Sequence, residues 1–429
     1  MLKRLELSNL GPAPSMTLDL APRLNLLTGD NGLGKSFLLD IAWWALTRKW
    51  PAEINSSLTT GKQALPAAPG DSMIRFSFMG KSKTEEYESA YDRRDSAWTG
   101  RPGRPANPGL VLYAMADGSF AVWDPARNYW KTQNGLDVQD RRPAYVFNPS
   151  EIWNGLKGED GNPVCNGLIQ DWAGWQKEEG EAFGHLKTVL SSLSPSEAES
   201  ISPGRLRRIS IDDARDIPTL SMPYGQDVPV LHASSGMRRI ISLAYVLVWA
   251  WEEHRKASEF LGESTTDQII FLVDEIESHL HPKWQLKIIR SLLGVMKGLA
   301  SSAQIQLVAA THSPLVLASV ESYFDADKDA WFDLDYVADS DQKVLLTQRP
   351  FEPRGDVSNW LTSEAFDLPS ARSTEMADLL DKAAALLDDP NPSKESFEAM
   401  HQRLIKELNP KDSFLLRWRS ICTRKGLFS

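Results

Sequence analysis

The chain has 429 residues, 42% of them hydrophobic and 24% charged, a composition typical of a soluble globular protein with two to three domains. Its formal net charge of -10 argues against a bulk nucleic-acid binder, although it leaves room for a local basic patch that contacts DNA. Two cysteines cannot form a disulfide framework or a metal cluster, and without a signal peptide or a membrane-length apolar run we expect a cytoplasmic protein with no membrane contact.

Strands are predicted at the beginning of the chain, because apolar and polar residues largely alternate across residues 2–7 and 16–20. A continuously apolar run at residues 24–28 predicts a third, buried strand. It ends at Gly29, and apolar residues at helical spacing predict a helix over residues 35–46. Strand, glycine-rich loop and helix thus follow one another in the order that a phosphate-binding loop requires.

Residues 29–36 fit the phosphate-loop pattern G-x-x-x-x-G-K-[ST] completely. The glycines let backbone N–H groups point inward at phosphates, and the following helix adds the positive end of its dipole. Lys35 is expected to reach the β- and γ-phosphates, and Ser36 to ligate Mg²⁺. The residues expected to bind ATP here are Gly29, Asp30, Asn31, Gly32, Leu33, Gly34, Lys35, Ser36 and Phe37.

The middle of the chain, residues 51–229, changes character and shows neither an internal repeat nor sustained heptads. Its Pro-, Gly-, Ala- and Ser-rich segments are typical of loops. Strands are predicted at 73–78 and 110–122, a helix at 169–193, and loops at 61–70, 95–110 and 202–225.

A buried α/β pattern returns after residue 228. We expect a long helix at 237–253, a buried strand at 268–273, a helix after Pro282 and a second buried strand at 304–310. Short acidic strands follow after about residue 321, and then helices at 373–387 and 395–408 with a linker at 389–392.

Polar residues with phosphate chemistry follow both of these buried strands. Asp274 would emerge at the carboxyl end of its strand, beside the phosphate loop, and hold Mg²⁺ directly or through water. Glu275 is then placed to polarise the attacking water. His312 could donate a hydrogen bond to the γ-phosphate, although a lone histidine at a strand end is usually structural.

Three small residues, Ser234, Ser235 and Gly236, open the long predicted helix. Small residues at a helix N-terminus suit a bound phosphate, although the same pattern is a common N-cap. The interpretation as a phosphate contact gains weight from their place about 40 residues before Asp274.

The order of these motifs resembles that of ABC-type ATPase heads, in which they are called Walker A, signature, Walker B and H-loop. The resemblance implies a head-to-tail homodimer, or a higher oligomer, with two ATP molecules between the subunits. Ser234 and Gly236 would then contact ATP bound to the partner, and Lys35, Glu275 and His312 would be the catalytic residues. It also implies an α/β fold of the P-loop NTPase class.

Two family motifs fit less well. The D-loop position corresponds to residues 278–281, where transport-type ABC proteins usually carry an aspartate near the end and this chain has His281. This departure argues against a transporter subunit. The Q-loop glutamine cannot be assigned among four candidates: Gln133, Gln139, Gln170 and Gln176.

The run D-E-I-E-S-H-L-H-P at residues 274–282 resembles stand-alone ATPases related to RecF and to the Overcoming-Lysogenization-Defect proteins. Only about 200 residues separate Walker A from the signature, too few for the long coiled coils of SMC-type ATPases. A Toprim nuclease domain would need paired aspartates such as Asp333 and Asp335, or Asp325 and Asp327. We interpret these as solvated acidic loops, because no glycine-flanked glutamate precedes them.

What remains resembles the ATPase subunit of Septu-type antiphage systems, in which a separate HNH nuclease is the effector. The leading hypothesis is therefore an ATP-hydrolysing, Mg²⁺-dependent regulatory subunit that controls a separate nuclease or toxin. The alternatives are a RecF-like repair ATPase that clamps DNA and a self-contained metal-dependent nuclease. The basic residues at 205–208 and 238–239 could meet DNA, but a solvated or salt-bridged face explains them better.

These expectations divide the chain into an ATPase core, a lid and an extension. Residues 1–55 and 228–320 would form the ABC-type core, residues 56–227 an inserted lid, and residues 321–429 a C-terminal α/β-to-helical extension. The fifteen tryptophans are expected in cores or subunit contacts rather than in base stacking.

Overall fold

The computed structural model of the protein describes residues 1–424 except 101–104, 129, 134–135, 140–143, 159, 338–342 and 390–392. The chain forms two compact units, Met1–Trp360 and Leu361–Ser429. Among the described residues, no helix is both long and apolar enough to cross a membrane.

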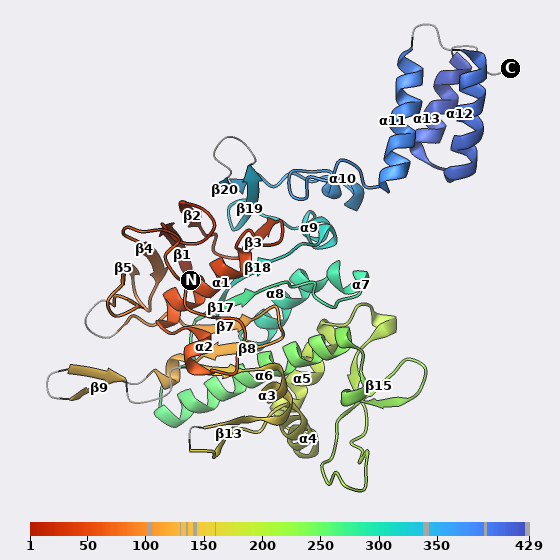
Figure 1. Cartoon of the computed structure of the whole chain (residues 1–429). Helices are drawn as coiled ribbons and strands as arrows, with labels where there is room; N and C mark the ends of the chain where they lie inside the picture. The colour runs from red at the N-terminus through yellow and green to blue at the C-terminus, as the bar shows by residue number, and fades with distance from the viewer. Residues whose placement is uncertain are drawn as a thin grey trace. The chain divides into compact units, whose positions relative to one another are not determined.

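The larger unit is built around an eight-stranded sheet with the order β11-β8-β7-β17-β18-β3-β19-β20 (Figure 1). Its five central strands are parallel, so their carboxyl ends meet at one edge of the sheet. These strands are β7 (Leu110–Ala114), β17 (Gln268–Val273), β18 (Gln304–Ala310), β3 (Leu24–Gly29) and β19 (Asp329–Val337). The antiparallel outer strands are β8 (Phe120–Trp123), β11 (Ala144–Phe147) and β20 (Lys343–Arg349).

A second, antiparallel sheet has the order β2-β1-β4-β5-β6. It comprises β1 (Leu2–Ser8), β2 (Ser15–Asp19), β4 (Met73–Met79), β5 (Thr84–Asp92) and β6 (Ala97–Trp98). Helix α1 (Lys35–Thr47) shares one hydrophobic core with both sheets. Because neighbouring elements surround most of the helix, apolar residues occur on nearly all of its faces.

The predicted place of the tryptophans in the core is confirmed for the helices. Trp43 and Trp44 of α1 are buried, and the Trp44 ring stacks on Trp50 with 5.4 Å between ring centroids. Trp172 and Trp249 are also buried. Aromatic packing therefore holds these helices in the core.

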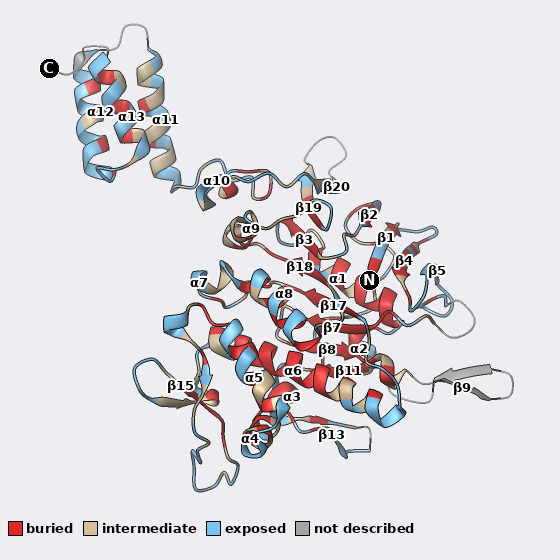
Figure 2. Cartoon of the chain, turned by 180° about the vertical axis from the view of Figure 1, so that it is seen from behind, coloured by how far each residue is buried: buried red, intermediate tan, exposed pale blue. Residues whose placement is uncertain are grey.

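Helices α6 (Ser235–Leu261), α5 (Glu181–Ser192) and α8 (Ile288–Leu299) pack against one another, and α8 also packs against β18. The middle of α6 is buried and appears red in Figure 2. The predicted helix 169–193 is two helices, α4 (Leu168–Glu178) and α5. The break falls at Glu179, whose φ of 52° lies in the left-handed region, and at Gly180, which caps α5.

The structure divides the chain differently from the expected lid and extension. Strands from residues 73–147 enter both large sheets, and β19 and β20 complete the central sheet, so the larger unit continues to Trp360. In β7, which lies between β8 and β17, all five residues are buried, so this segment belongs to the interior of the central sheet rather than to a lid.

The remaining elements of the larger unit are short. The small strands are β9 (Trp130–Gln133), β10 (Leu136–Gln139), β12 (Leu156–Lys157), β13 (Pro163–Cys165), β14 (Ser202–Pro203), β15 (Thr219–Ser221) and β16 (Asp227–Pro229). The short helices are α2 (Pro51–Ile54), α3 (Pro149–Asn154), α7 (Pro282–Gln285) and α9 (Pro314–Val320), and α10 (Val357–Leu361) ends one residue beyond the larger unit.

The smaller unit contains α11 (Thr374–Asp388), α12 (Lys394–Glu407) and α13 (Ser413–Arg424), which share their own hydrophobic core. The two helices predicted from the sequence are therefore confirmed, and a third follows them. Of the linker predicted at 389–392, residues 390–392 lie outside the described residues.

Candidate nucleotide-binding site

The carboxyl edge of the central sheet brings three of the predicted motifs together. The phosphate loop follows β3, Asp274 and Glu275 follow β17, and His312 follows β18. The strands β17, β18 and β3 are direct neighbours, so the three loops are adjacent at this edge. The α/β P-loop NTPase fold predicted from the sequence is confirmed.

Backbone geometry shapes the loop between β3 and α1. Gly29, Gly32 and Gly34 have φ values of 124°, 82° and 101°, which L side chains rarely adopt. Gly34 precedes α1, and no described side chain caps the N-terminus of that helix. The first N–H groups of α1 are therefore available to an anion, as the predicted phosphate site requires.

Two alanine substitutions in this loop are expected to differ in stability. At Gly29 an added Cβ would lie 2.2 Å from the Leu334 carbonyl oxygen, whereas no described atom lies within 4 Å of a Cβ at Gly32. Gly29→Ala combines backbone strain with a clash and should lower the free energy of unfolding by about 2–4 kcal/mol, and Gly32→Ala by about 1 kcal/mol. Urea denaturation measures both, and equal losses would contradict this account of the loop.

Lys35 is buried at the start of α1, and its ammonium group faces the loop. Nζ donates hydrogen bonds to the carbonyl oxygens of Gly29, at 2.6 Å, and Asp30, at 2.9 Å. Burial lowers the pKa of Lys35 to about 8, and the carboxylate of Asp274 opposes this shift. The cation is thus held at the centre of the loop, where a phosphate would compensate its charge.

Asp274 and Ser36 form an oxygen-rich pair beside the loop. The Asp274 side chain is buried, which raises its pKa, and a hydrogen bond from Ser36 acts in the opposite direction. The Asp274 N–H is fixed to the Ala114 carbonyl oxygen at 2.8 Å. A hydroxyl and a carboxylate are ligands that Mg²⁺ prefers, so the pair fits the predicted metal site.

A cavity of about 430 Å³ opens next to this pair. Asp40, one turn after Ser36 on α1, lines it and accepts a hydrogen bond of 2.9 Å from the Tyr113 hydroxyl. Burial raises the pKa of Asp40 to about 7. Much of the remaining wall comes from residues 59–65, and the sequence indicated only a loop for the part from residue 61 onward.

Glu275 and His312 follow the neighbouring strands β17 and β18. Glu275 adopts a φ of 44°, and a non-glycine residue in this region is a strained feature that clusters at functional sites. Burial lowers the pKa of His312, as does the nearby charge of Lys35, while Glu275 raises it. Lys35, Glu275 and His312 are therefore within electrostatic reach of one another.

The predicted signature residues lie elsewhere. The Ser234 hydroxyl caps α6 by accepting from the Met237 N–H at 3.4 Å, and Ser235 is exposed beside it. Ser234 and Met237 line a separate cavity of about 570 Å³, to which no phosphate-loop residue contributes. Gly236 packs against the backbone of the segment after β17: an added Cβ would lie 2.6 Å from the His279 carbonyl oxygen.

The structure also reveals a residue that the sequence reasoning missed. Glu277 accepts hydrogen bonds from the Thr311 hydroxyl, at 2.7 Å, and from the His312 N–H, at 2.5 Å. The only signal in the sequence was its place in the acidic run after Asp274, which gave no partner.

The four candidate Q-loop glutamines remain without an assignment. Gln176 lies on α4, where it donates to the Gly204 carbonyl oxygen at 2.8 Å and accepts from Trp172. Gln170 lies on the same helix. The side chains of Gln133 and Gln139 lie outside the described residues.

The paired aspartates are not all solvated loops, which corrects one interpretation of the sequence. Asp333 lies on β19, is fully buried and accepts a hydrogen bond of 2.6 Å from the Thr28 hydroxyl, because its strand pairs with β3. Asp335 forms an ion pair with Arg349. Asp325 is ion-paired with Lys328 near the surface. No group of three or more His, Cys, Asp or Glu residues in the described part of the chain could hold a metal ion.

The basic residues do not form one continuous surface. Arg205, Arg207 and Arg208 are exposed near β14, and Arg238 lies over the Trp153 ring. Arg239 instead turns inward and donates to the Met115 carbonyl oxygen at 2.9 Å.

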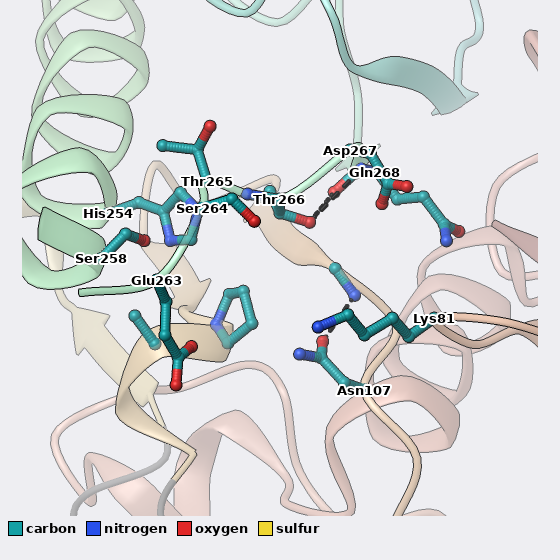
Figure 3. A pocket seen from close by; sticks show the side chains of 13 residues that line it. Lys81, Asn107, His254, Ser258, Glu263, Ser264, Thr265, Thr266, Asp267 and Gln268 are labelled. Carbon is teal, nitrogen blue, oxygen red and sulfur yellow. Dashed lines mark hydrogen bonds between the residues drawn. The ribbon is translucent and has the colours of Figure 1, made fainter. Parts of the chain in front are cut away.

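A smaller pocket of about 170 Å³ lies at the opposite, amino end of β17, beside Gln268 (Figure 3). His254 lines it, but both ring nitrogens are engaged: Nδ1 with Asp124 at 2.7 Å, and Nε2 as acceptor from the Thr266 N–H at 2.9 Å. This histidine is therefore committed to structure rather than to catalysis.

Comparison with known proteins agrees with this geometry. Residues 24–318 match the family described as "AAA domain, putative AbiEii toxin, Type IV TA system". The chain is 24% identical to the Septu protein PtuA of Bacillus thuringiensis over 417 residues, which is 94% of this chain and 93% of that protein.

Two further similarities are more limited. A retron Vc95 probable ATPase of Vibrio cholerae serotype O1 biovar El Tor is 31% identical over 102 residues, 23% of this chain and 17% of that protein. Among solved structures, the SMC head domain from Thermotoga maritima is 14% identical, with a TM-score of 0.39, and covers 81% of this chain and 99% of that one.

Proposed function

The chain belongs to this family of AAA-type ATPase domains, and we propose that it hydrolyses ATP as the regulatory subunit of an antiphage defence complex. The observation that supports ATP hydrolysis most directly is the convergence of the phosphate loop, Asp274–Glu275 and His312 at one edge of the sheet. These are the parts that phosphoryl transfer to water requires: an anion cradle, a cation, metal ligands and a group that orients water.

Each group has a distinct task in this proposal. The N–H groups of the loop and Lys35 bind the phosphates, and His312 donates a hydrogen bond to the γ-phosphate. Glu275 orients the attacking water and accepts its proton. Ser36 and Asp274 would hold Mg²⁺, which supplies charge neutralisation on the phosphates when bound.

We further propose that the signature acts on ATP bound to a second copy of the chain. Ser234 lies at an exposed helix N-terminus and lines a cavity that is separate from the phosphate loop. A helix N-terminus favours a phosphate, so a partner's ATP would be a suitable ligand. This arrangement makes the assembly head-to-tail, either a closed dimer or part of a higher oligomer.

The antiphage role rests on the similarity to a Septu protein across nearly the full length of both chains. In this role the ATPase holds a separate nuclease or toxin under control.

The experiment is to purify tagged Glu275→Gln protein from its native cells, with nuclease treatment, and to identify what co-elutes. A stoichiometric effector supports the proposal if it cleaves nucleic acid, or arrests growth, under the control of this ATPase. Recovery of the chain alone, with DNA in untreated samples, would instead favour a RecF-like ATPase that clamps DNA. Salt titration then distinguishes that case, because phosphate contacts make DNA binding steeply salt-sensitive.

A further inference from the structure

Glu277 occupies the turn between β17 and α7, three residues after Asp274, and its carboxylate points to the loop after β18. Oε2 accepts from the Thr311 hydroxyl at 2.7 Å, and Oε1 accepts from the His312 N–H at 2.5 Å. One side chain thus holds two successive residues of the loop that carries the His312 imidazole.

The position is costly for a carboxylate, because burial raises the pKa of Glu277 against the effect of its two hydrogen bonds. The carboxylate of Glu277 is not needed merely to anchor the end of β18. The Thr311 N–H already donates to the Leu27 carbonyl oxygen at 3.0 Å, and the Ile276 N–H to that of Ala310 at 3.2 Å. Glu277 adds a hydrogen bond that fixes the backbone N–H of His312.

A second side chain from the same segment supports the loop. The Ser313 hydroxyl donates to Gln285 Oε1 at 2.6 Å, and Gln285 Nε2 donates to the Leu280 carbonyl oxygen at 2.8 Å. The segment from Glu277 to Gln285 therefore holds the loop at His312 and at Ser313.

The same segment contacts α6, the helix that begins with the predicted signature residues and is called the signature helix below. Gly236, the second residue of α6, leaves no room for a Cβ against the His279 carbonyl oxygen. A displacement of α6 would therefore press on residues 277–285, which in turn hold the loop of His312. Packed elements of this kind transmit small shifts because they cannot deform continuously.

We propose that Glu277 is a positioning residue for ATP hydrolysis, which fixes the backbone of His312 so that its imidazole is aligned with the γ-phosphate and responds to the signature helix. This inference rests on the proposed function, because it assigns His312 to ATP. Glu277 acts through His312 and needs no contact with the nucleotide.

The test compares wild type with Glu277→Ala and Glu277→Gln. In nucleotide-free protein, amide hydrogen exchange at His312 should be about ten-fold or more faster in Glu277→Ala, because the N–H loses its acceptor. Glu277→Gln should lie between, since its amide oxygen can still accept one of the two bonds. If Glu277→Ala does not fold, Glu277→Gln alone carries the comparison.

Nucleotide affinity supplies the second measurement. With fluorescent analogues, Glu277→Ala should weaken ATP by about ten-fold and leave ADP unchanged, because only ATP carries the γ-phosphate that His312 addresses. The turnover number should fall with it, and Glu277→Gln should restore part of both.

Glu321→Gln is the matched control. Glu321 likewise accepts backbone N–H groups, from Arg354 at 2.7 Å and Gly355 at 3.2 Å, but outside the site. It should change neither His312 exchange nor the ratio of ATP to ADP affinity.

Two results would overturn the role of Glu277: unchanged exchange at His312, or an equal loss of ATP and ADP affinity. Failure of the proposed ATP hydrolysis looks different, because wild-type protein would then bind no ATP or leave the bound ATP unhydrolysed. The exchange measurement on nucleotide-free protein would still report whether Glu277 fixes the loop.

Discussion

Replacing Lys35 with alanine is expected to weaken ATP binding by about 10- to 100-fold, the loss that follows from one or more hydrogen bonds between charged groups. Lys35 is the cation at the centre of the phosphate loop, and its Nζ hydrogen-bonds to two loop carbonyl oxygens. Isothermal titration calorimetry with ATP and Mg²⁺ measures the effect directly.

Lys49→Ala is the control for this experiment. Lys49 is exposed just beyond the other end of α1, so its loss removes the same charge without touching the loop. Equal affinities of Lys35→Ala and wild type would show that ATP does not bind at this loop.

Glu275→Gln is expected to bind ATP normally but to hydrolyse it about ten-fold or more slowly, which corresponds to a barrier higher by about 1.4 kcal/mol. Glutamine can still hydrogen-bond to a water molecule, but it cannot accept the proton. Steady-state phosphate release and ATP titration of the same preparation separate the two effects.

Glu259→Gln serves as the control, because Glu259 is an exposed carboxylate near the end of α6. If Glu275→Gln hydrolysed ATP at the wild-type rate, Glu275 would have no role in the reaction. A parallel loss of ATP binding would show that the residue supports the fold of the site instead.

The phosphate loop could be predicted from the sequence because all its determinants are local. Gly29, Gly32 and Gly34 supply the positive φ values, and the apolar run before them and the helix after them are contiguous in the chain. The strand before Asp274 was predictable for the same reason, since residues 269–273 form a continuous apolar run.

The domain boundaries could not be predicted in this way. Strands β7, β8 and β11 join the central sheet from within the expected lid, and β19 joins it from the expected extension. The pairings of β7 with β17 and of β19 with β3 join residues that are 159 and 305 positions apart in the chain, so no local pattern predicts them.

The same limit applies to two acidic residues. Glu277 acquires its role only when β17 and β18 lie side by side and bring His312 within reach. Asp333 is a buried partner of Thr28 rather than a surface acid only because β19 pairs with β3. Neither relation can be read from the composition of its own segment.

The central claim, that ATP on one chain is completed by the signature of another, is tested most directly by mixing two inactive variants. Lys35→Ala weakens its own phosphate site and is assayed at an ATP concentration too low to fill it, whereas Ser234→Arg blocks the signature but keeps its own phosphate loop. In a random mixture half of the dimers combine both chains, and each carries one intact composite site, so we expect at most about a quarter of wild-type turnover to return. A mixture as inactive as its components, with both variants folded and assembled, would contradict the account.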